Sequence, residues 1–476
     1  MQDPDIHTSP DLSQDVLHPA PRRGSTGRFR DGFYSFFHWF TFRGNITVCI
    51  IALTVFILHL VVINNPPQPA FDEEHYVPEA RLFLNGEGMN RSEHPPLAKW
   101  FIASGMFIFG DNATGWRFPS VLFGTASIFL FYLICVKLTR RSDLDEPVEQ
   151  EEALPMRRGS GWFRIDVFVP VLATSLFAFE NLSFVQSHVA MLDVFSITLM
   201  LLGFLLYLRG RHVGAGIVLG LSMLAKSMAV LAIVAVLVHW IITRRKEIIA
   251  EVVFTFNTLW GRGGERPPVS DILRMIGFII AVPAVWFGLI PLLEYPATHV
   301  WANPLERTWS MLGTHISLST NSYTAGIATT PWRWLYFPEG IFYWYTPHYV
   351  GSVSWTIWAL IIPSMGYLAF EIVKRKLKHA IVALFALSWF FGVYILLIPL
   401  ELATNRLMYI FYIYPAIPPV TLAIAWAGWR LWGITRWRRK GKKIFLWGLM
   451  AYLLGSVVVF FLMSPYGSGV FQFPQA

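Results

Sequence analysis

Acids and histidines gather in a segment that directly follows the first long apolar run. Residues 71–99 read FDEEHYVPEARLFLNGEGMNRSEHPPLAK, with Asp72, Glu73 and Glu74 in a row and His94 just before a Pro–Pro pair. A charged side chain at the centre of a bilayer costs roughly 2.5–3.5 kcal/mol, so these groups must face water, protein or a substrate. A solvated surface loop is the alternative, but the acids abut the membrane and the prolines stiffen the return.

Basic residues fall near the ends of later apolar runs, where they could meet an anion. Lys99, Lys226 and Arg406 occupy such positions, and Lys226 stands in the almost wholly apolar GLSMLAKSMAVLAIV. A lysine there either reaches the membrane surface or meets an anion. Arg117 begins another run, where it could also reach the surface or form a salt bridge with an acid of the first segment. Glu401 could pair with Arg406 instead of leaving it for a ligand.

A carboxylate at the membrane face with cations beneath it fits one class of reaction. A lipid phosphate leaving group needs cations, and an alcohol acceptor needs a general base. The product would be a glycoside, with the lipid phosphate released. Because a lipid phosphate is already a good leaving group, no divalent metal is an evident requirement. Asp193, near the start of another run, could simply cap its helix.

A second long piece, residues 294–353, is rich in aromatic side chains. Its cluster PWRWLYFPEGIFYWY includes Trp332 and Trp334, and His348 follows shortly after. Aromatic planes with a few polar groups suit sugar rings, although an interfacial belt of a membrane protein has a similar composition. The cluster is denser than a belt needs, which favours a role in substrate binding.

The composition requires membrane helices to position these groups. Of 476 residues, 54% are hydrophobic and 14% are charged, against about 25% charged in soluble proteins. Apolar runs near 20 residues recur, which indicates an all-α polytopic membrane protein. The two cysteines predict neither a disulfide framework nor a metal cluster. Eleven spans are predicted, at about 45–64, 117–138, 165–183, 190–208, two within 213–243, 275–293, 354–373, 379–399, 407–432 and 444–463.

The distribution of charge orients these spans. Residues 1–44 are predicted as a cytoplasmic tail with an interfacial helix, and residues 45–476 as the transmembrane domain, with outer loops at 65–115 and 294–353. Residues 96–110 are expected to lie along the membrane. With this topology only eight of the 38 lysines and arginines lie outside, an asymmetry that follows the positive-inside rule: Arg81, Arg91, Lys99, Arg117, Lys226, Arg307, Arg333 and Arg406.

Several ordered motifs resemble the protein O-mannosyltransferase family. FDEEHY, EHPPLAKW and GWRFPSVLFG are similar to its acidic pair, its His-Pro-Pro segment and its Trp-Arg…Pro-Ser helix start. HVAMLDVF, GLSMLAKSMAVL, TPWRWLYFPEG and NRLMYIFYIYPAIPP resemble later family segments. Ala98 replaces a usual glycine, and His188 stands where arginine is frequent. No extra soluble domain interrupts residues 294–353, which resembles a prokaryotic member.

The resemblance implies a GT-C type glycosyltransferase fold with about eleven transmembrane helices. It implies transfer of mannose, or a related hexose, from a polyprenyl or dolichyl phosphate to Ser/Thr hydroxyls of proteins at the outer membrane face, with inversion. Asp72 would be the general base, with Glu73 positioning acceptor or base. The implied donor- and substrate-binding residues are His94, Lys99, Arg117, Lys226, Trp332, Trp334, His348 and Arg406.

Two other functions remain open from the sequence. A transferase that moves a sugar from polyprenyl phosphate to a lipid or glycan would use the same acids and cations. A lipid transporter is a different class, and transporters usually carry internal repeats and Gly/Pro-broken helices at the midplane. No repeat is visible here, and the polar residues gather at one face, so an enzyme is favoured.

The predicted orientation can be tested by labelling single cysteines. A cysteine that replaces Asn85 should react with a membrane-impermeant reagent from outside intact cells, and one that replaces Arg158 should not, because the charge asymmetry places these positions on opposite sides. Permeabilised cells, in which both positions should react, provide the control. Labelling of the second position alone would reverse the topology.

Overall fold

The computed structural model describes residues 43–145, 161–260, 270–317, 328–345, 348–374, 380–436 and 438–467. Compactness divides the chain into residues 1–46 and residues 47–476. The predicted cytoplasmic tail and its interfacial helix therefore lie almost wholly outside the described residues. The described residues belong almost entirely to the second unit, residues 47–476.

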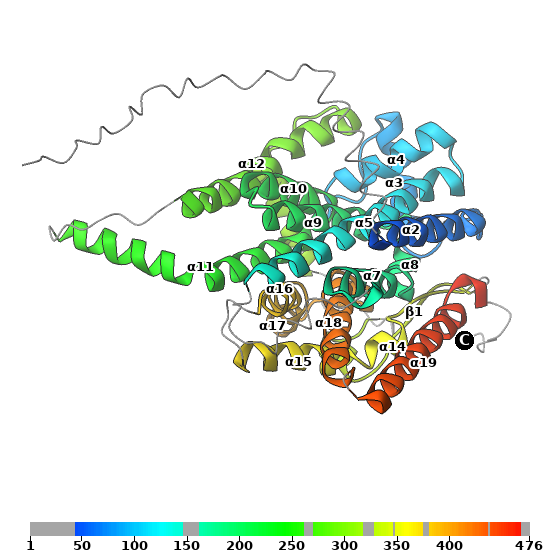
Figure 1. Cartoon of the computed structure of the whole chain (residues 1–476). Helices are drawn as coiled ribbons and strands as arrows, with labels where there is room; N and C mark the ends of the chain where they lie inside the picture. Colours follow the sequence, from blue (N-terminus) through cyan, green and yellow to red (C-terminus); the bar gives the residue numbers. More distant parts are fainter. Residues whose placement is uncertain are drawn as a thin grey trace, which may run out of the picture. The chain divides into compact units, whose positions relative to one another are not determined.

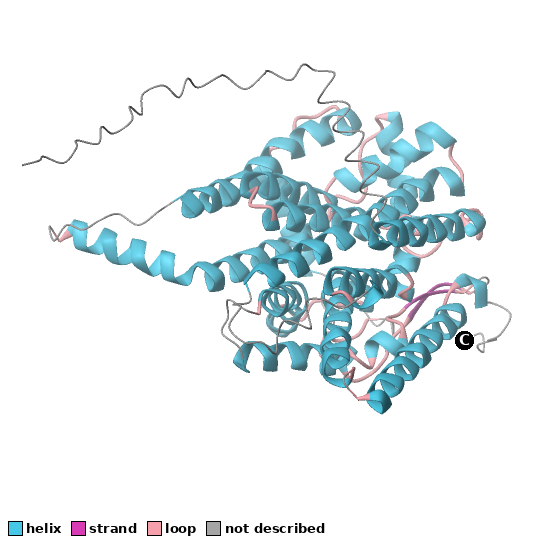
Figure 2. Cartoon of the chain, in the orientation of Figure 1, coloured by secondary structure: helices cyan, strands magenta, loops and turns pink. Residues whose placement is uncertain are grey.

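Long apolar helices dominate this unit (Figures 1 and 2). Within the described ranges, eight helical stretches are long and apolar enough to cross a membrane. They are Arg43–Val62, Ala113–Arg140, Ser227–Leu259, Asp271–Thr298, Trp355–Lys374, Ile381–Thr404, Ile410–Thr435 and Arg439–Met463. The chain is therefore an integral, multi-pass membrane protein.

Four shorter apolar helices complete the set. They are α4 (Leu97–Phe109), α7 (Ile165–Ala178), α9 (Leu192–Leu208) and α10 (His212–Ala225). The last three coincide with predicted spans, and α4 with the segment expected along the membrane. A spanning helix needs about 17–25 residues, so the number of segments that cross completely stays a prediction.

The remaining elements follow in chain order. They are α2 (Arg43–Val62), α3 (Glu73–Asn85), α5 (Ala113–Asp145), η1 (Gly161–Phe163), α8 (Asn181–Gln186), η2 (Ser227–Ala229), α11 (Val230–Leu259), α12 (Ser270–Thr298), α13 (Pro304–Ser317), η3 (Arg333–Leu335), β1 (Ile341–Trp344), β2 (Tyr349–Gly351), α14 (Trp355–Trp358), α15 (Ile361–Lys374), α16 (Ile381–Phe390), η5 (Phe391–Ile395), α17 (Leu397–Thr404), η6 (Ile410–Ala416), α18 (Ile417–Thr435), α19 (Arg439–Met463) and η7 (Pro465–Gly467).

Helix α9 lies at the centre of the core, packed against α5 and α10. Its residues are buried along almost the whole length. Small residues allow the close approach: a Cβ on Gly203 of α9 would lie 2.8 Å from Leu219, and one on Gly216 of α10 would lie 2.5 Å from the carbonyl oxygen of Phe278 in α12. Such contacts are how membrane helices gain packing energy, because lipid offers no hydrophobic driving force between them.

The chain leaves helical geometry at Lys226, between α10 and α11. Its backbone is extended, with φ −153° and ψ 121°, and η2 leads into α11. This break lies within residues 213–243, where the sequence predicts two short spans. The break directs one cation into the protein at the level where α9 begins.

The second long loop, residues 294–353, ends in an antiparallel hairpin in which Ile341 of β1 pairs with Gly351 of β2. The amide Nδ2 of Asn181 donates to the carbonyl oxygen of Val350 at 2.6 Å. The carboxylate of the adjacent Glu180 accepts from the backbone N–H of Ser354 at 2.9 Å, as well as capping its own helix, α8. These bonds anchor the hairpin to the helical core.

The first long loop, residues 65–115, is held by an ion pair between Glu73 and Arg117. Both side chains are fully buried, with Nε–Oε1 and Nη2–Oε2 distances of 2.9 and 2.7 Å. The guanidinium also donates to the carbonyl oxygens of Ile63, Pro66 and Gln68. Of the two interactions expected for Arg117, the salt bridge to a first-loop acid is therefore the one observed.

Removing this ion pair should unfold the first loop. Arg117→Ala leaves a carboxylate buried without its partner, which typically costs 3–5 kcal/mol. Arg117→Lys should recover only part of this, because an ammonium cannot reproduce the bidentate geometry and the three carbonyl contacts. The measurement is the thermal unfolding midpoint of the purified protein in detergent.

Arg81 offers a matched control, since it pairs with Asp111 at 2.7 Å at the surface. An exposed pair contributes about 0–1 kcal/mol, so Arg81→Ala should leave the midpoint nearly unchanged. Equal shifts for Arg81→Ala and Arg117→Ala would show that the buried pair is not what holds the loop.

Candidate active site

Asp72 stands at the N-terminus of α3, directly before the buried Glu73. It occupies the N-cap position, yet its side chain makes no capping hydrogen bond. The preceding Phe71 has a φ of 52°, a left-handed conformation that is rare for a bulky residue. Its ring stacks on that of Tyr343 in β1, with centroids 4.3 Å apart. The two long loops therefore meet next to Asp72, whose own backbone is already helical, with φ −66° and ψ −9°.

The surroundings of Asp72 raise its pKa to about 6. Burial is the main cause of the increase. The Asp193 carboxylate also raises the pKa of Asp72, whereas the cationic side chains of Lys226 and Arg91 lower it. Burial also raises the pKa of Tyr343 well above its usual range, with further contributions from Asp193 and Asp72. A carboxyl with a pKa near 6 is ionised at neutral pH and is a stronger base than an ordinary aspartate, which suits general-base catalysis.

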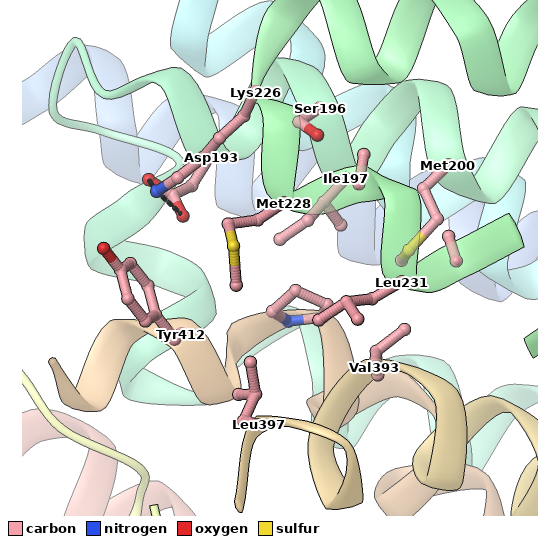
Figure 3. A pocket seen from close by; sticks show the side chains of 13 residues that line it. Asp193, Ser196, Ile197, Met200, Lys226, Met228, Leu231, Val393, Leu397 and Tyr412 are labelled. Atoms are coloured by element: carbon pink, nitrogen blue, oxygen red, sulfur yellow. Dashed lines mark hydrogen bonds and ion pairs between the residues drawn. The ribbon is translucent and has the colours of Figure 1, made fainter. Parts of the chain in front are cut away.

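Lys226 meets an anion, which is one of the two outcomes expected for it. Its ammonium lies 2.7 Å from each carboxylate oxygen of Asp193, in the first turn of α9 (Figure 3). It also lies 5.1 Å from the ring centroids of Phe411 and Tyr412 in η6. The N-cap of α9 is Met191, so Asp193 does not cap its helix as the sequence suggested. Both partners are buried.

This ion pair lies at one end of a mostly apolar, partly open cavity, with about 460 Å³ of empty space that includes open solvent. The apolar lining comes from α9, α11, η5 and α17, with Tyr412 on the side of the ion pair (Figure 3). Representative side chains are Ile197, Leu231, Val393 and Leu397. A cavity with charged side chains at one end and apolar walls can bind an amphiphilic ligand, whose polar group and hydrocarbon chain contact the two parts.

Arg406 lies next to this cavity. Its side chain is partly buried, and its Nη1 is 3.9 Å from the sulfur of Met228, which lines the cavity. Both predicted phosphate-binding cations therefore lie at this cavity, Lys226 in its lining and Arg406 beside Met228.

Lys99 forms an ion pair with an acid of the first long loop, whereas the resemblance implied that it binds the donor phosphate. It is fully buried, and its ammonium lies 2.8 Å from Glu79 and 2.5 Å from the carbonyl oxygen of Arg91. Glu79 in turn accepts the backbone N–H of Asn90 and Arg91. Lys99, like Arg117, therefore holds loop backbone. No sequence pattern predicted the Glu79–Lys99 pair, although Glu79 lies in the acidic segment.

The predicted histidines and tryptophans lie at different depths. His94 is partly exposed, with Nε2 3.4 Å from the Tyr76 hydroxyl, and His348 is buried against the Phe342 ring at 6.2 Å. Trp334 is fully buried and donates to the Thr329 hydroxyl at 2.7 Å, whereas Trp332 is partly exposed. Trp332 is thus the more accessible of the two.

Two tyrosines, Tyr343 and Tyr412, lie at the candidate site but were not among the predicted site residues. Each lies in a motif that the sequence had singled out, the aromatic cluster and NRLMYIFYIYPAIPP. Their positions next to Asp72 and Lys226 come from long-range packing of the hairpin and η6. Across the described ranges, no three His, Cys, Asp or Glu side chains gather as a metal site would require.

Comparison with known proteins gives these groups a family context. Residues 93–143 match the family model of dolichyl-phosphate-mannose-protein mannosyltransferase. A polyprenol-phosphate-mannose–protein mannosyltransferase of Mycolicibacterium smegmatis is 30% identical over 156 residues, which is 32% of this chain and 25% of that protein. The protein of the same description from Corynebacterium glutamicum is 24% identical over 462 residues, 83% of this chain and 84% of the relative.

The fold has a solved counterpart. The Saccharomyces cerevisiae protein O-mannosyltransferase Pmt1–Pmt2 complex, described as bound to the sugar donor, contains a chain that superposes with a TM-score of 0.65 at 12% identity. The match covers 90% of each chain, so the helical arrangement is the GT-C fold that the sequence motifs implied. The family model, the relatives and the shared fold together make this chain similar to protein O-mannosyltransferases.

Proposed function

We propose that this protein transfers mannose, or a related hexose, from a polyprenyl phosphate to Ser/Thr hydroxyls of a protein acceptor. The observation that carries the proposal is the position of Asp72, whose carboxyl interacts electrostatically with the Lys226–Asp193 pair at the head of an apolar cavity. The relatives are named polyprenol-phosphate-mannose–protein mannosyltransferases, which agrees with this donor and acceptor. The alignment with the Mycolicibacterium smegmatis relative spans a quarter of that protein's length.

Asp72 acts as the general base in this proposal. Its carboxylate takes the proton of the acceptor hydroxyl as that oxygen forms a bond with the anomeric carbon. The bond from the anomeric carbon to the phosphate oxygen breaks at the same time, and its electron pair leaves with the lipid phosphate. Attack from the side opposite to the leaving group inverts the anomeric centre. A base with a pKa near 6 is well matched to this transfer at neutral pH.

Lys226 and Arg406 bind the donor phosphate, while the apolar cavity takes the first part of the prenyl chain. Phosphate competes with Asp193 for the Lys226 ammonium, and Arg406 adds a second cation. Charge-assisted contacts of this kind stabilise the leaving group as negative charge develops on it. His94, His348, Trp332 and Tyr343 surround the path of the sugar and acceptor from the two long loops.

Glu73, Arg117 and Lys99 are positioning residues in this mechanism. Each is fully buried and bonded to loop backbone, so each fixes the segment that carries Asp72 without touching substrate. The site faces the outside of the cell membrane, in agreement with the charge asymmetry of the loops.

Replacement of Asp72 should abolish transfer without unfolding the protein. Loss of a general base typically lowers the rate by on the order of 10²–10⁴, so Asp72→Asn should be nearly inactive in an assay with polyprenyl-phosphate mannose and an acceptor peptide. Glu74→Gln, an exposed acid two residues away, is the matched control and should keep normal activity. Turnover of Asp72→Asn close to that of the unaltered protein would remove Asp72 from the mechanism.

The raised pKa of Asp72 leads to a second, independent prediction about how stability and transfer rate depend on pH. Its value of about 6 in the folded protein exceeds the ordinary 3.8, so the folded state holds this proton more tightly than the unfolded chain. Ionised Asp72 therefore lowers the free energy of unfolding above pH 6, and this penalty is lost as the pH falls from about 6 toward 4. Asp72→Asn should melt at the same or a higher temperature than the unaltered protein at pH 7.5, while the transfer rate of the unaltered protein rises with pH through 6. A lower melting temperature at pH 7.5 would contradict this pKa.

Donor affinity should separate phosphate-binding cations from positioning ones. Arg406→Ala should weaken binding of polyprenyl-phosphate mannose about tenfold or more, because a charge-assisted contact contributes roughly 1.5–3 kcal/mol. Lys226 is best removed as Asp193→Asn with Lys226→Gln, which leaves no buried carboxylate unpaired, and should have a similar effect.

Lys99 gives the contrasting case in the same titration. Lys99→Met should lower the unfolding midpoint through loss of the Glu79 pair, yet the folded fraction should bind donor with nearly normal affinity. Donor affinity that falls only in the Lys99 variant would reassign the phosphate site to the first loop.

A further inference from the structure

A second and larger cavity lies at the opposite end of α9 from the proposed active site. It is bounded by the end of α9, the start of α10, the middle of α11, the start of α12 and parts of α15 and α16. About 2420 Å³ of empty space, which includes open solvent, lies between them. Helix α9 runs from Asp193 beside the first cavity to Arg209 at the second. At 1.5 Å per residue the two ends are roughly 24 Å apart, which is close to the thickness of a bilayer's apolar core, about 30 Å.

The lining of this cavity combines cations with apolar side chains. Its charged members are Arg209, Arg244, Arg245, Lys246, Glu247, Asp271 and Arg274. Its aliphatic members are Leu208, Ile242, Ile372, Val373, Ile381 and Leu384. A cavity with both kinds of wall, at the end of apolar helices, has the chemistry of the boundary between lipid headgroups and lipid chains.

The two acids in the lining are already engaged. Arg244 lies 2.7 Å from Glu247 and 2.6 Å from Asp271, and Arg274 lies 3.3 Å from Asp271. Within the described ranges, Arg209, Arg245 and Lys246 form no ion pair. The cavity therefore has an excess of positive charge that the described side chains do not neutralise.

Buried polar atoms in the wall also lack partners. His212 is 8% exposed, and its Nδ1 has no hydrogen-bond partner among the described residues. The indole Nε1 of Trp240 is likewise without one. Buried polar atoms are nearly always hydrogen-bonded, so such atoms in a cavity wall indicate a ligand or water that supplies the missing contact. Both residues line the cavity beside the unpaired cations.

We propose that this cavity binds the phosphate headgroup of an anionic lipid from the leaflet opposite to the active site. Arg209, Arg245 and Lys246 contact the phosphate oxygens, and His212 and Trp240 donate to the headgroup. The aliphatic wall takes the upper part of an acyl chain. A soluble phosphate would satisfy the cations but would leave this apolar wall exposed, and for this reason the lipid is the occupant that the lining favours.

The test is lipid binding by the full-length protein, delipidated in detergent and measured by native mass spectrometry. Phosphatidylglycerol is titrated against the unaltered protein, with phosphatidylcholine and inorganic phosphate as the alternative ligands. Phosphatidylglycerol should bind most tightly. The double variant Arg245→Gln/Lys246→Gln should bind it at least tenfold more weakly, because two charge-assisted contacts are lost. Arg209→Gln should lower the affinity severalfold.

The control variant is Lys442→Gln/Lys443→Gln, which removes the same charge from exposed positions on α19 that do not line the cavity. It should bind phosphatidylglycerol like the unaltered protein. Equal losses in both double variants would reduce the effect to general surface charge and overturn the site. Displacement of phosphatidylglycerol by an equal concentration of inorganic phosphate would also overturn the proposal, since the apolar wall would then contribute nothing. The unfolding midpoint of each variant verifies that the helices remain packed.

Discussion

The buried pair of Glu73 and Arg117 is the interaction on which the arrangement of the outer residues depends. One guanidinium collects a carboxylate and three carbonyl oxygens, and the same carboxylate accepts two backbone N–H groups. Every polar atom of the pair thus has at least one partner, which is the condition under which a buried ion pair can be tolerated. Because Glu73 is fixed inward, the adjacent Asp72 is left at the surface of the core with a carboxylate that caps nothing.

Much of the architecture follows from the sequence because apolar runs and basic flanks report directly on membrane insertion. The helix along 97–109 and a break between two short apolar helices near Lys226 agree with the apolar segments predicted there. The number of complete crossings was less accessible: α7, α9 and α10 are short, and length alone does not say whether a short buried helix traverses the bilayer.

The site was only partly predictable, because pairing between charged residues is a property of packing. Lys99 and Arg117 carried the correct charge for a phosphate, but both are captured by acids, Glu79 and Glu73, that periodicity does not single out as partners. Asp193 looked like a helix cap and proved to be the partner of Lys226. Tyr343 reaches the site through a hairpin whose register no local pattern specifies. Residue type indicated the chemistry, whereas the three-dimensional contacts decided which residues are free to perform it.

The Lys226–Asp193 pair has a consequence for selectivity. Any anion that approaches Lys226 meets an ammonium whose charge is already balanced by a carboxylate that it contacts through both oxygens at 2.7 Å. A small anion therefore gains little net attraction there, while it loses its own hydration. A ligand that also buries a hydrocarbon chain in the adjoining cavity gains apolar transfer energy in addition, at about 25 cal/mol for each Å² removed from water. In the proposed mechanism the ion pair therefore favours anions attached to a lipid over free phosphate and soluble sugar phosphates at Lys226.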